Sequence, residues 1–308
     1  MPTRTSHCEV AAFGAINLDT IVKARQTIKR DTSTPSDFIE TPGGVAANVA
    51  RALARCGVSS ALAGAVGQDE TGAMLKRMLA EAGIEISDVR ELEKPTGRYV
   101  ALHDPDGSLA AAAVHGEIAD SLPPDFFDEM EGAAASARIW FVDANLPALL
   151  LSRVMEMAGE RLLVADAVSV AKAPRLAAIL PRLDMLFCNR AEAAELAGMT
   201  PGASALELAA KLARQGAKAC CVTDGARPAG CALQGECFSI SPLNARVVDV
   251  TGAGDALIAG WIAARLKVPA GRPALEAGFA ASAIAVEAKG SAPDNLNWDA
   301  IEQRMREN

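Results

Sequence analysis

The sequence has no apolar run that approaches the roughly 20 residues of a membrane-spanning helix. Its N-terminal apolar stretch is short and is followed by polar residues, so we expect a first β-strand rather than a signal peptide. An excess of basic residues is also missing, because 30 lysines and arginines stand against 38 aspartates and glutamates, a net charge of −8. We therefore expect neither a membrane nor a nucleic acid as a partner. A small anionic substrate in a local basic pocket stays open.

Metal-binding, disulfide and hydrolase patterns are missing as well. The seven cysteines are an odd number and no two have CxxC spacing, so neither a zinc site nor a disulfide framework is indicated. Reduced, buried thiols in a cytoplasmic protein are the simplest interpretation. The only histidines are His7, in a terminus expected to fray, and His103 and His115, which gives poor support to a Ser-His-Asp hydrolase. A P-loop enzyme and a dehydrogenase lack support too, since neither GxxxxGKS/T nor GxGxxG occurs.

The pattern along the chain predicts one α/β domain over residues 1–308. Half of the residues are hydrophobic, enough to bury a sizeable core. Short apolar runs alternate with alanine- and leucine-rich segments, which is typical of a doubly wound, mostly parallel sheet with helices on both faces. The expected strands are Glu9–Ile16, Ala61–Val66, Arg138–Asp143, Leu162–Ala167, Met185–Cys188 and Ala219–Thr223. The expected helices are Val45–Arg55, Gly72–Ala82, Pro147–Ala158, Ala205–Gln215, Gly252–Leu266, Pro273–Ala288 and Trp298–Arg306.

Two polar segments interrupt this alternation. One covers about residues 17–42 and mixes lysine, arginine, threonine, serine and proline. The other covers about residues 95–117 and alternates around an Asp-Pro-Asp-Gly turn, which predicts a β-hairpin. We expect these two insertions to pair as a small β lid over the edge where the parallel strands end.

The segment DVTGAGDALIAG carries the strongest chemical signal. It follows a strand-like run, Ala245–Val250, and opens a long helix. Three small residues, Gly252, Ala253 and Gly254, let backbone N–H groups at the helix N-terminus approach a phosphate or a developing negative charge. Asp255 in the first helical turn is then placed to accept a proton from an attacking hydroxyl. A helix start without a catalytic role is the alternative for this motif alone.

This segment resembles the signature of the PfkB/ribokinase family of carbohydrate kinases. Four further elements resemble that family in the same order along the chain: NLD from Asn17, PGGVAANVA from Pro42, NRAE from Asn189 and VTDG from Val222. A turn or a helix start could explain each one, but together they span most of the chain. The resemblance implies a ribokinase-like fold and an ATP-dependent phosphotransferase that uses Mg²⁺.

The resemblance also implies roles for individual residues. The residues implied in binding the substrate are Asn17, Asp19, Gly43, Gly44 and Asn48. The residues implied in binding ATP and, through water, Mg²⁺ are Asn189, Glu192, Thr223 and Gly225. The residues implied in binding an activating K⁺ are Asp249, Thr251 and Ser291. Asp255 is the implied base, beside the amides of residues 252–254.

Two internal segments bear on the substrate. DANL, with Asp143 and Asn145, and DAVSVAK, from Asp166 to Lys172, resemble segments of pseudouridine kinases, although Ala167 stands where those have proline. Both follow expected strands, at the edge where α/β proteins build their sites. Lys172 could hold a phosphate or a base carbonyl, or could be a solvated side chain. The best hypothesis is phosphorylation of pseudouridine.

Three alternatives stay open. The chain could phosphorylate another substrate, such as ribose, adenosine or inosine. It could instead be a non-catalytic sugar or nucleotide sensor on the same fold, although a sensor does not need Asp255. The sequence also leaves open whether the chain is a monomer or a homodimer.

Overall fold

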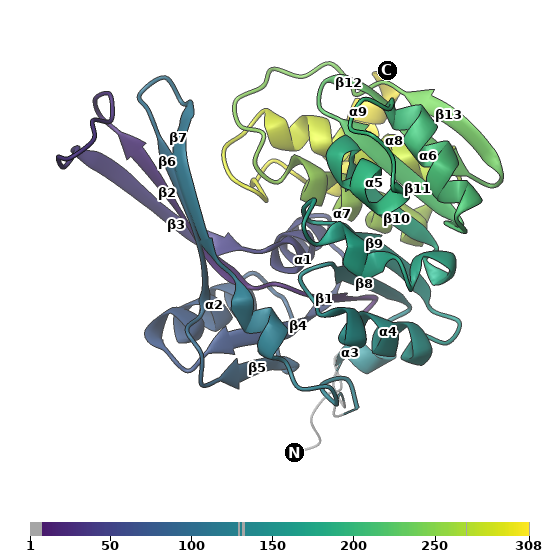
Figure 1. The fold of residues 1–308 in the computed structure, drawn as a ribbon, viewed down its shortest axis with the longest axis horizontal. Helices are drawn as coiled ribbons and strands as arrows, with labels where there is room; N and C mark the ends of the chain where they lie inside the picture. Colours follow the sequence, from purple (N-terminus) through teal and green to yellow (C-terminus); the bar gives the residue numbers. More distant parts are fainter. Residues whose placement is uncertain (1–7, 129, 131–132, 269, 308) are drawn as a thin grey trace.

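Two β-sheets organise the residues that the computed structural model describes, which are 8–128, 130, 133–268 and 270–307 (Figure 1). The larger sheet has nine strands in the order β13-β12-β11-β10-β9-β8-β1-β4-β5, and the smaller has four in the order β3-β2-β6-β7. In the larger sheet the pairs β11–β12 and β12–β13 are antiparallel, and the other neighbours pair in parallel. This mostly parallel α/β architecture confirms the predicted fold class.

The strands of the large sheet are short, and the central ones are buried on both faces, as a sheet covered by two helical layers requires. They are β1 Val10–Phe13, β4 Ser60–Gly67, β5 Val89–Leu92, β8 Ile139–Asp143, β9 Leu162–Asp166, β10 Met185–Asn189, β11 Ala219–Asp224, β12 Arg227–Leu233 and β13 Glu236–Ile240. Four neighbouring parallel strands end on polar residues: Asp143, Asp166, Asn189 and Asp224. Polar side chains therefore gather at one edge of the sheet.

Helices cover the two faces of this sheet and form two separate hydrophobic cores. One face carries α1 Val45–Arg55, α2 Glu70–Glu81, α7 Ala253–Lys267, α8 Arg272–Val286 and α9 Trp298–Arg306. The other carries α3 Ala133–Ser136, α4 Ala148–Met157, α5 Arg190–Ala197 and α6 Ala205–Arg214, with the 3₁₀ turns η1 Glu117–Ser121, η2 Ala173–Leu176 and η3 Leu180–Arg182. No helix within the described residues is long and apolar enough to cross a bilayer.

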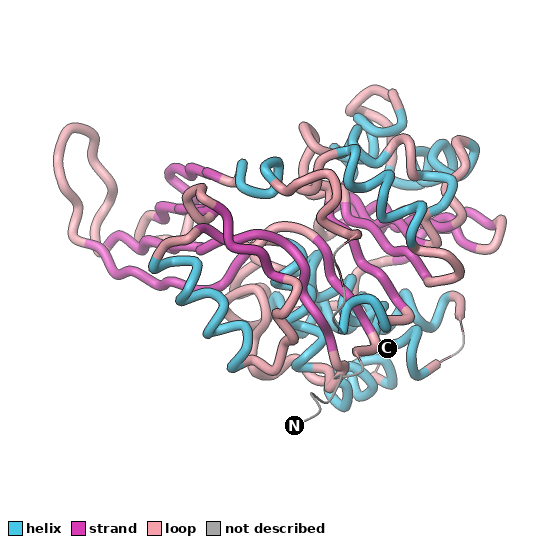
Figure 2. The backbone as a smooth tube through the Cα atoms, turned by 90° about the horizontal axis from the view of Figure 1, so that it is seen from below, coloured by secondary structure: helices cyan, strands magenta, loops and turns pink. Residues whose placement is uncertain are grey.

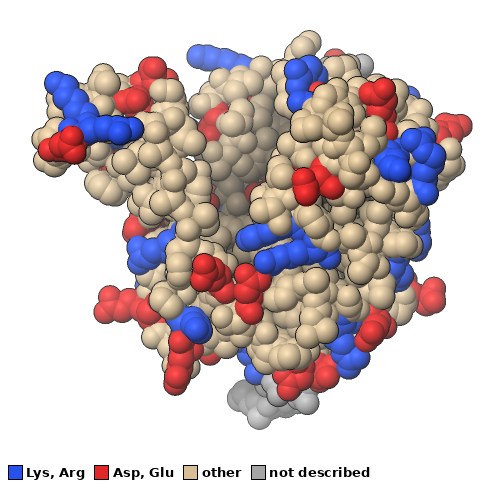
Figure 3. Space-filling view, viewed as in Figure 1, with Lys and Arg blue, Asp and Glu red and all other residues tan. Residues whose placement is uncertain are grey.

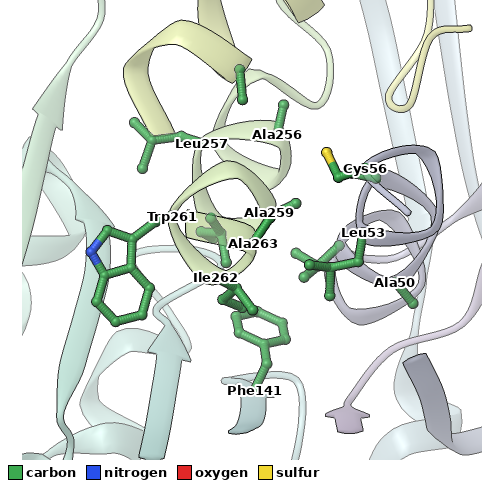
Figure 4. Close-up of a cluster of buried hydrophobic side chains, with 14 of the residues drawn as sticks. Ala50, Leu53, Cys56, Phe141, Ala256, Leu257, Ala259, Trp261, Ile262 and Ala263 are labelled. Carbon is green, nitrogen blue, oxygen red and sulfur yellow. The ribbon is translucent and has the colours of Figure 1, made fainter. Parts of the chain in front are cut away.

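Helix α7 has a continuous run of buried residues. All residues from Ala256 to Ala264 are buried. Ala259 faces Leu53 of α1 and Ile262 lies near Phe141 of β8, whereas Trp261 points away from α1 (Figure 4). A helix that is apolar all round must lie inside the protein. Its position is therefore fixed by packing, which holds its polar N-terminus, with Asp255, at a defined place beside α1.

The second sheet is built from the two predicted insertions. Its strands are β2 Asn17–Ala24, β3 Ser36–Gly43, β6 Gly97–His103 and β7 Leu109–His115. Strands β6 and β7 form the predicted hairpin around the Asp-Pro-Asp-Gly turn, and β6 pairs in parallel with β2. The sheet projects away from the body of the molecule (Figures 1 and 2). We call it the lid sheet.

Most expected elements are confirmed, with ends that differ by a few residues. The expected strand Ala245–Val250 is wrong: this segment forms no strand, and the N–H groups of Val248 and Asp249 donate to the carbonyl of Val286 at the end of α8. Its valines are exposed instead of alternating between a core and solvent. Strands β5, β12 and β13, which lie at the two ends of the large sheet, were not predicted, and neither were helices α3 and α5. His7 lies outside the described residues.

Candidate active site

The N-terminus of α7 has the geometry of an anion site. Gly252 caps the helix with a φ of 74°, and a Cβ there would lie 2.4 Å from the Cα of Ser291, so only glycine fits. The amide of Ala253 donates to the carbonyl of Val250 over 3.3 Å. Within the described residues, no hydrogen bond engages the amides of Gly252 or Gly254. Two uncommitted N–H groups therefore stand at the positive end of a long helix.

Asp255 stands beside these amides and contacts α1. The side-chain amide of Asn48 donates from Nδ2 to Oδ2 of Asp255 over 2.8 Å. The pKa of Asp255 is raised to about 7, because burial and the charges of Asp143 and Asp19 raise it more than the Asn48 bond and Arg51 lower it. A carboxylate with a pKa near neutrality suits a general base. Its second oxygen, Oδ1, has no bond from Asn48.

The amide of Asn48 is itself held from its other side. The hydroxyl of Ser291 donates to Oδ1 of Asn48 over 2.8 Å, and Nη1 of Arg51 lies 3.4 Å from the same oxygen. Nη1 of Arg51 also donates to the carbonyl of Pro42 at 2.8 Å and to the Ser291 hydroxyl at 3.2 Å. Arg51 was not predicted as a site residue, although it follows Asn48 by three residues and so lies on the same face of the helix.

The base of the lid sheet brings Asp19 against Gly43. A Cβ on Gly43 would lie 2.0 Å from Cγ of Asp19, and a Cβ on Gly97 would lie 2.1 Å from Oδ1 of Asn17. Both polar side chains therefore rest directly on glycine backbone. The pKa of Asp19 is raised to about 6, because burial raises it more than the charge of Arg51 lowers it. The next residue, Gly44, caps α1 and accepts the amide of Asn48.

Beneath this site, the carboxylate of Asp143 accepts hydrogen bonds from three chain segments. Its Oδ2 accepts the amides of Ala15 and Ala46, each at 3.0 Å, and its Oδ1 accepts the amide of Asn145 at 2.9 Å. The side chain is completely buried, and burial raises its pKa although these hydrogen bonds lower it. Asp143 therefore links the turn after β1, the start of α1 and the turn after β8.

The turn after β9 is strained and places Lys172 on Asn145. Val168, a β-branched residue, has a φ of 64°, and its amide donates to Oδ1 of Asp166 at 2.8 Å. Burial raises the pKa of Asp166, and the nearby charges of Glu192 and Asp255 add to this. Nζ of Lys172 donates to Oδ1 of Asn145. The two segments singled out for substrate choice thus meet at the ends of β8 and β9.

Asn189 and Glu192 form a capping box at the start of α5. The side chain of Asn189 accepts the amides of Ala191 and Glu192, and the carboxylate of Glu192 accepts the backbone and side-chain N–H groups of Asn189 at 2.8 and 2.6 Å. Glu192 is buried, which raises its pKa. The helix-start interpretation of this motif is therefore confirmed as local structure. A water-mediated contact with a metal ion remains a proposal.

The turn after β11 is open and charged. Thr223 donates to the carbonyl of Cys188 over 3.4 Å, and Gly225 forms the turn with a φ of 62°. Asp224 pairs with Arg227 at 2.7 Å and with Arg190 at 3.1 Å. These bonds, above all that from Arg227, lower the pKa of Asp224.

A cavity of about 600 Å³ lies between the lid sheet and the loops that flank α7 (Figure 3). Its lining includes Asp19, Arg51 and the tip of the β6–β7 hairpin from His103 to Gly107. Asp255 and Asn48 adjoin it through Arg51 and Ser291. The sequence analysis placed His103 in the lid but did not assign the hairpin tip to the site.

The three residues expected at a K⁺ site also line this cavity. The carboxylate of Asp249 accepts the amides of Thr251 at 2.9 Å and of Gly290 at 3.2 Å. Burial raises the pKa of Asp249, but these bonds and the charge of Lys23 outweigh it and lower the pKa. Nowhere in the described residues do three or more His, Cys, Asp or Glu side chains gather as a metal site.

Comparisons with known proteins identify the class of protein. A family model described as pfkB family carbohydrate kinase matches residues 8–298. The chain therefore belongs to the pfkB family of carbohydrate kinases. It is an ATP-dependent phosphotransferase that acts on a hydroxyl of a sugar or a nucleoside.

The individual relatives act on different acceptors, so the comparisons leave the acceptor of this chain open. Pseudouridine kinase of Escherichia coli K12 is 26% identical over 257 residues, which are 82% of each chain. A solved carbohydrate kinase from Agrobacterium tumefaciens is 29% identical, with a TM-score of 0.84 over 96% of both chains. Arabidopsis thaliana ribokinase, solved with ribose and ATP, is 23% identical, with a TM-score of 0.83 over 97% of this chain and 99% of that one.

Proposed function

We propose that this chain phosphorylates the 5′-hydroxyl of pseudouridine with ATP. The observation that carries the proposal is the contact between Lys172 and Asn145 at the ends of two adjacent parallel strands. Both residues belong to the segments that resemble pseudouridine kinases, and the E. coli enzyme of that name is similar over 82% of this chain.

In this proposal Asp255 is the general base. Its pKa of about 7 lets it take the proton of the attacking hydroxyl near neutral pH, and Oδ1 is the oxygen left for that proton. The free amides of Gly252 and Gly254 would stabilise charge on the transferred phosphoryl group, with Ala253 supporting the turn. Phosphoryl transfer depends mainly on such positioning and electrostatic stabilisation.

The ribosyl hydroxyls would be held between the lid sheet and α1. Asp19 accepts hydrogen bonds, and Asn17 and Asn48 both donate and accept them. Gly43 and Gly44 let the sugar approach the backbone of the site. Lys172, held by Asn145, would then donate to a carbonyl oxygen of the uracil ring.

ATP and Mg²⁺ would occupy the neighbouring strand ends. Mg²⁺ usually keeps several waters and takes one or two carboxylates together with substrate phosphates. Glu192 fits this role, because each of its oxygens accepts one hydrogen bond from Asn189 and keeps a free lone pair. The nucleotide would lie along the turn of Thr223 and Gly225. The ion would neutralise charge on the phosphates.

A potassium ion is a further part of the proposal. Asp249, Thr251 and Ser291 would bind it beside the anion site. The hydroxyl of Ser291 already donates to Asn48 and accepts from the positively charged Arg51, so Ser291 would contribute its carbonyl oxygen. Equal rates with and without K⁺ would remove this ion from the proposal.

The lid sheet would close over the bound substrate. It holds one wall of the cavity, and closure excludes water from the transferred group. Hydrogen exchange of residues 17–42 and 95–117 should slow when pseudouridine and a non-hydrolysable ATP analogue are both present. Unchanged exchange in both segments would contradict a moving lid.

We also propose a cytoplasmic homodimer that pairs through the lid sheet. Its edge strand β7 is exposed along its whole length, and Phe38 and Val114 expose 69% and 71% of their area. An exposed apolar edge of this kind invites pairing with another chain. The molar mass in solution should be twice that of the chain, and Val114→Lys should lower it.

The deciding experiment compares acceptors in an ADP-release assay. Pseudouridine, uridine, adenosine, inosine, ribose and fructose are tested at equal concentration with ATP and Mg²⁺. The highest kcat/KM is expected for pseudouridine, because a site with buried polar partners rejects substrates that leave them unpaired. A higher value for another acceptor would replace the substrate, and no ADP with any acceptor would favour the sensor.

A further inference from the structure

We propose that Arg51 is a positioning residue that orients the side chain of Asn48 and thereby sets the protonation of Asp255. This inference rests on the proposed role of Asp255 as the base. It assigns a function to a residue that none of the motifs contains.

Arg51 joins three segments that meet at the active site. Its Nη1 donates to the carbonyl of Pro42 at the end of β3 and to the hydroxyl of Ser291 in the loop after α8, at 2.8 and 3.2 Å. It also lies 3.4 Å from Oδ1 of Asn48 and from the hydroxyl of Thr41. One guanidinium nitrogen thus connects the base of the lid sheet, α1 and the loop that packs on Gly252.

These contacts fix which way the Asn48 amide points. A side-chain amide has an acceptor oxygen on one side and a donor NH₂ group on the other. Ser291 and Arg51 both present donors to Oδ1, so the NH₂ group must face Asp255, where it donates over 2.8 Å. The flipped amide would place NH₂ against the guanidinium and its oxygen against the carboxylate. Arg51 therefore helps to select the orientation that stabilises ionised Asp255.

The charge of Arg51 acts in the same direction. The groups that face Asp255 come from several elements: Asn48 and Arg51 from α1, Asp19 from β2, Asp143 from β8 and Asp166 from β9. The carboxylates of Asp19 and Asp143 favour protonated Asp255, and Arg51 opposes them. Burial lowers the pKa of Arg51, but a guanidinium keeps its charge in proteins.

Loss of Arg51 should shift the pH dependence of activity toward higher pH. A base must be deprotonated, so activity rises with pH through the pKa of Asp255. Without Arg51 that pKa increases, because a positive charge and one restraint on Asn48 are lost together. The acid limb of kcat/KM should then move to higher pH, by about one unit, as is usual for the loss of a nearby opposite charge.

The experiment measures kcat/KM against pH for Arg51→Met and Arg51→Lys, with the best acceptor and saturating ATP. Methionine keeps much of the length but has no charge, and it should show the shifted acid limb. Lysine keeps the charge but has a single donor group, so its limb should stay within a few tenths of a unit of the wild type while kcat falls. Arg55→Met, one turn along α1 at a half-exposed ion pair with Asp294, is the matched control and should change neither.

Several outcomes would overturn the inference. An unshifted acid limb in a folded Arg51→Met variant would do so, as would equal shifts in Arg51→Met and Arg51→Lys. If Arg51→Met does not fold, Arg51→Lys decides: wild-type kcat and limb count against the inference, and lowered kcat with an unmoved limb supports it. Asp255→Asn separates the two proposals, because a variant that retains activity removes the base itself.

Discussion

The acceptor side of the active site and the turn after β11 on its nucleotide side treat carboxylate charge in opposite ways. On the acceptor side, Asp19, Asp143 and Asp255 are held among backbone amides and other carboxylates, and burial raises the pKa of each. On the nucleotide side, Asp224 is paired with Arg227 and Arg190 at an open turn, which lowers its pKa. The acceptor side is therefore a place where protons can move near neutral pH, and the turn after β11 is a place of fixed charge.

Packing explains this difference. The acceptor side lies under the lid sheet and beside α7, where Asp143 is sealed from solvent and its oxygens accept three backbone amides. Desolvation disfavours a charged carboxylate there, and hydrogen bonds only partly compensate. The turn after β11 is open, so water and arginine both stabilise a charged Asp224. Substitutions should accordingly be costly on the first side and mild on the second.

The largest effect is expected for Asp255→Asn. Asparagine keeps the size and the contact with Asn48 but cannot accept the proton of the substrate hydroxyl. We expect kcat to fall about 10²–10⁴-fold, the usual contribution of acid–base catalysis, with ATP binding retained. Steady-state kinetics and ATP titration measure the two quantities.

Asp299→Asn is the matched control for this change. It makes the same substitution at an exposed position in the first turn of α9, and wild-type kcat is expected. If Asp255→Asn retains more than a tenth of the wild-type kcat, the base assignment is incorrect. The raised pKa values on the acceptor side would then have no role in proton transfer from the substrate.

An intermediate effect is expected for Gly43→Ala. The new Cβ would lie 2.0 Å from Cγ of Asp19, so the carboxylate must move. A displacement of about 1 Å in a substrate-binding group can cost about 10²-fold in rate. We expect kcat/KM for the acceptor to fall by about that factor while KM for ATP stays close to the wild type.

Gly202→Ala controls for the loss of a glycine as such. No atom lies within 4 Å of its added Cβ, and the residue is in the loop between α5 and α6. Its kinetics should match the wild type. An equal rise in KM for ATP and for the acceptor in Gly43→Ala would show that the change spreads across both sides of the site.

The sequence predicted the regular parts of the fold and the motif residues of the site. Helix α1 was predicted with its observed ends, Val45 and Arg55, because glycine stands just before it and soon after it. Strands β12 and β13 were missed, since β12 contains a proline and a glycine and lies near the end of the sheet. Proline and glycine are both rare inside strands, so the sequence of β12 does not look like that of a strand.

Contacts between distant segments could not be predicted from any local pattern. Arg51 gains its place from Pro42 and Ser291, which are 9 and 240 residues away. The run Ala245–Val250 has the composition of a strand, yet it pairs with no strand of either sheet. In both cases the deciding partner becomes adjacent only when the chain folds, which is why tertiary context overrides propensity.

The smallest effect is expected for Arg227→Ala on the nucleotide side. Arg227 donates to both oxygens of Asp224, but its side chain is 69% exposed, and exposed ion pairs contribute little to stability. Arg190 continues to pair with Asp224, so the charge of the turn stays fixed. We expect KM for ATP to change by less than about threefold, a difference that shrinks as salt screens the pair.

The stability control for this change is Arg306→Ala, which removes a similarly exposed pair with Glu302 on α9. The urea midpoint of Arg227→Ala should fall no further than that of Arg306→Ala. A loss of ATP affinity as large as the loss of acceptor turnover in Gly43→Ala would mean that the open turn is as tightly constrained as the buried side.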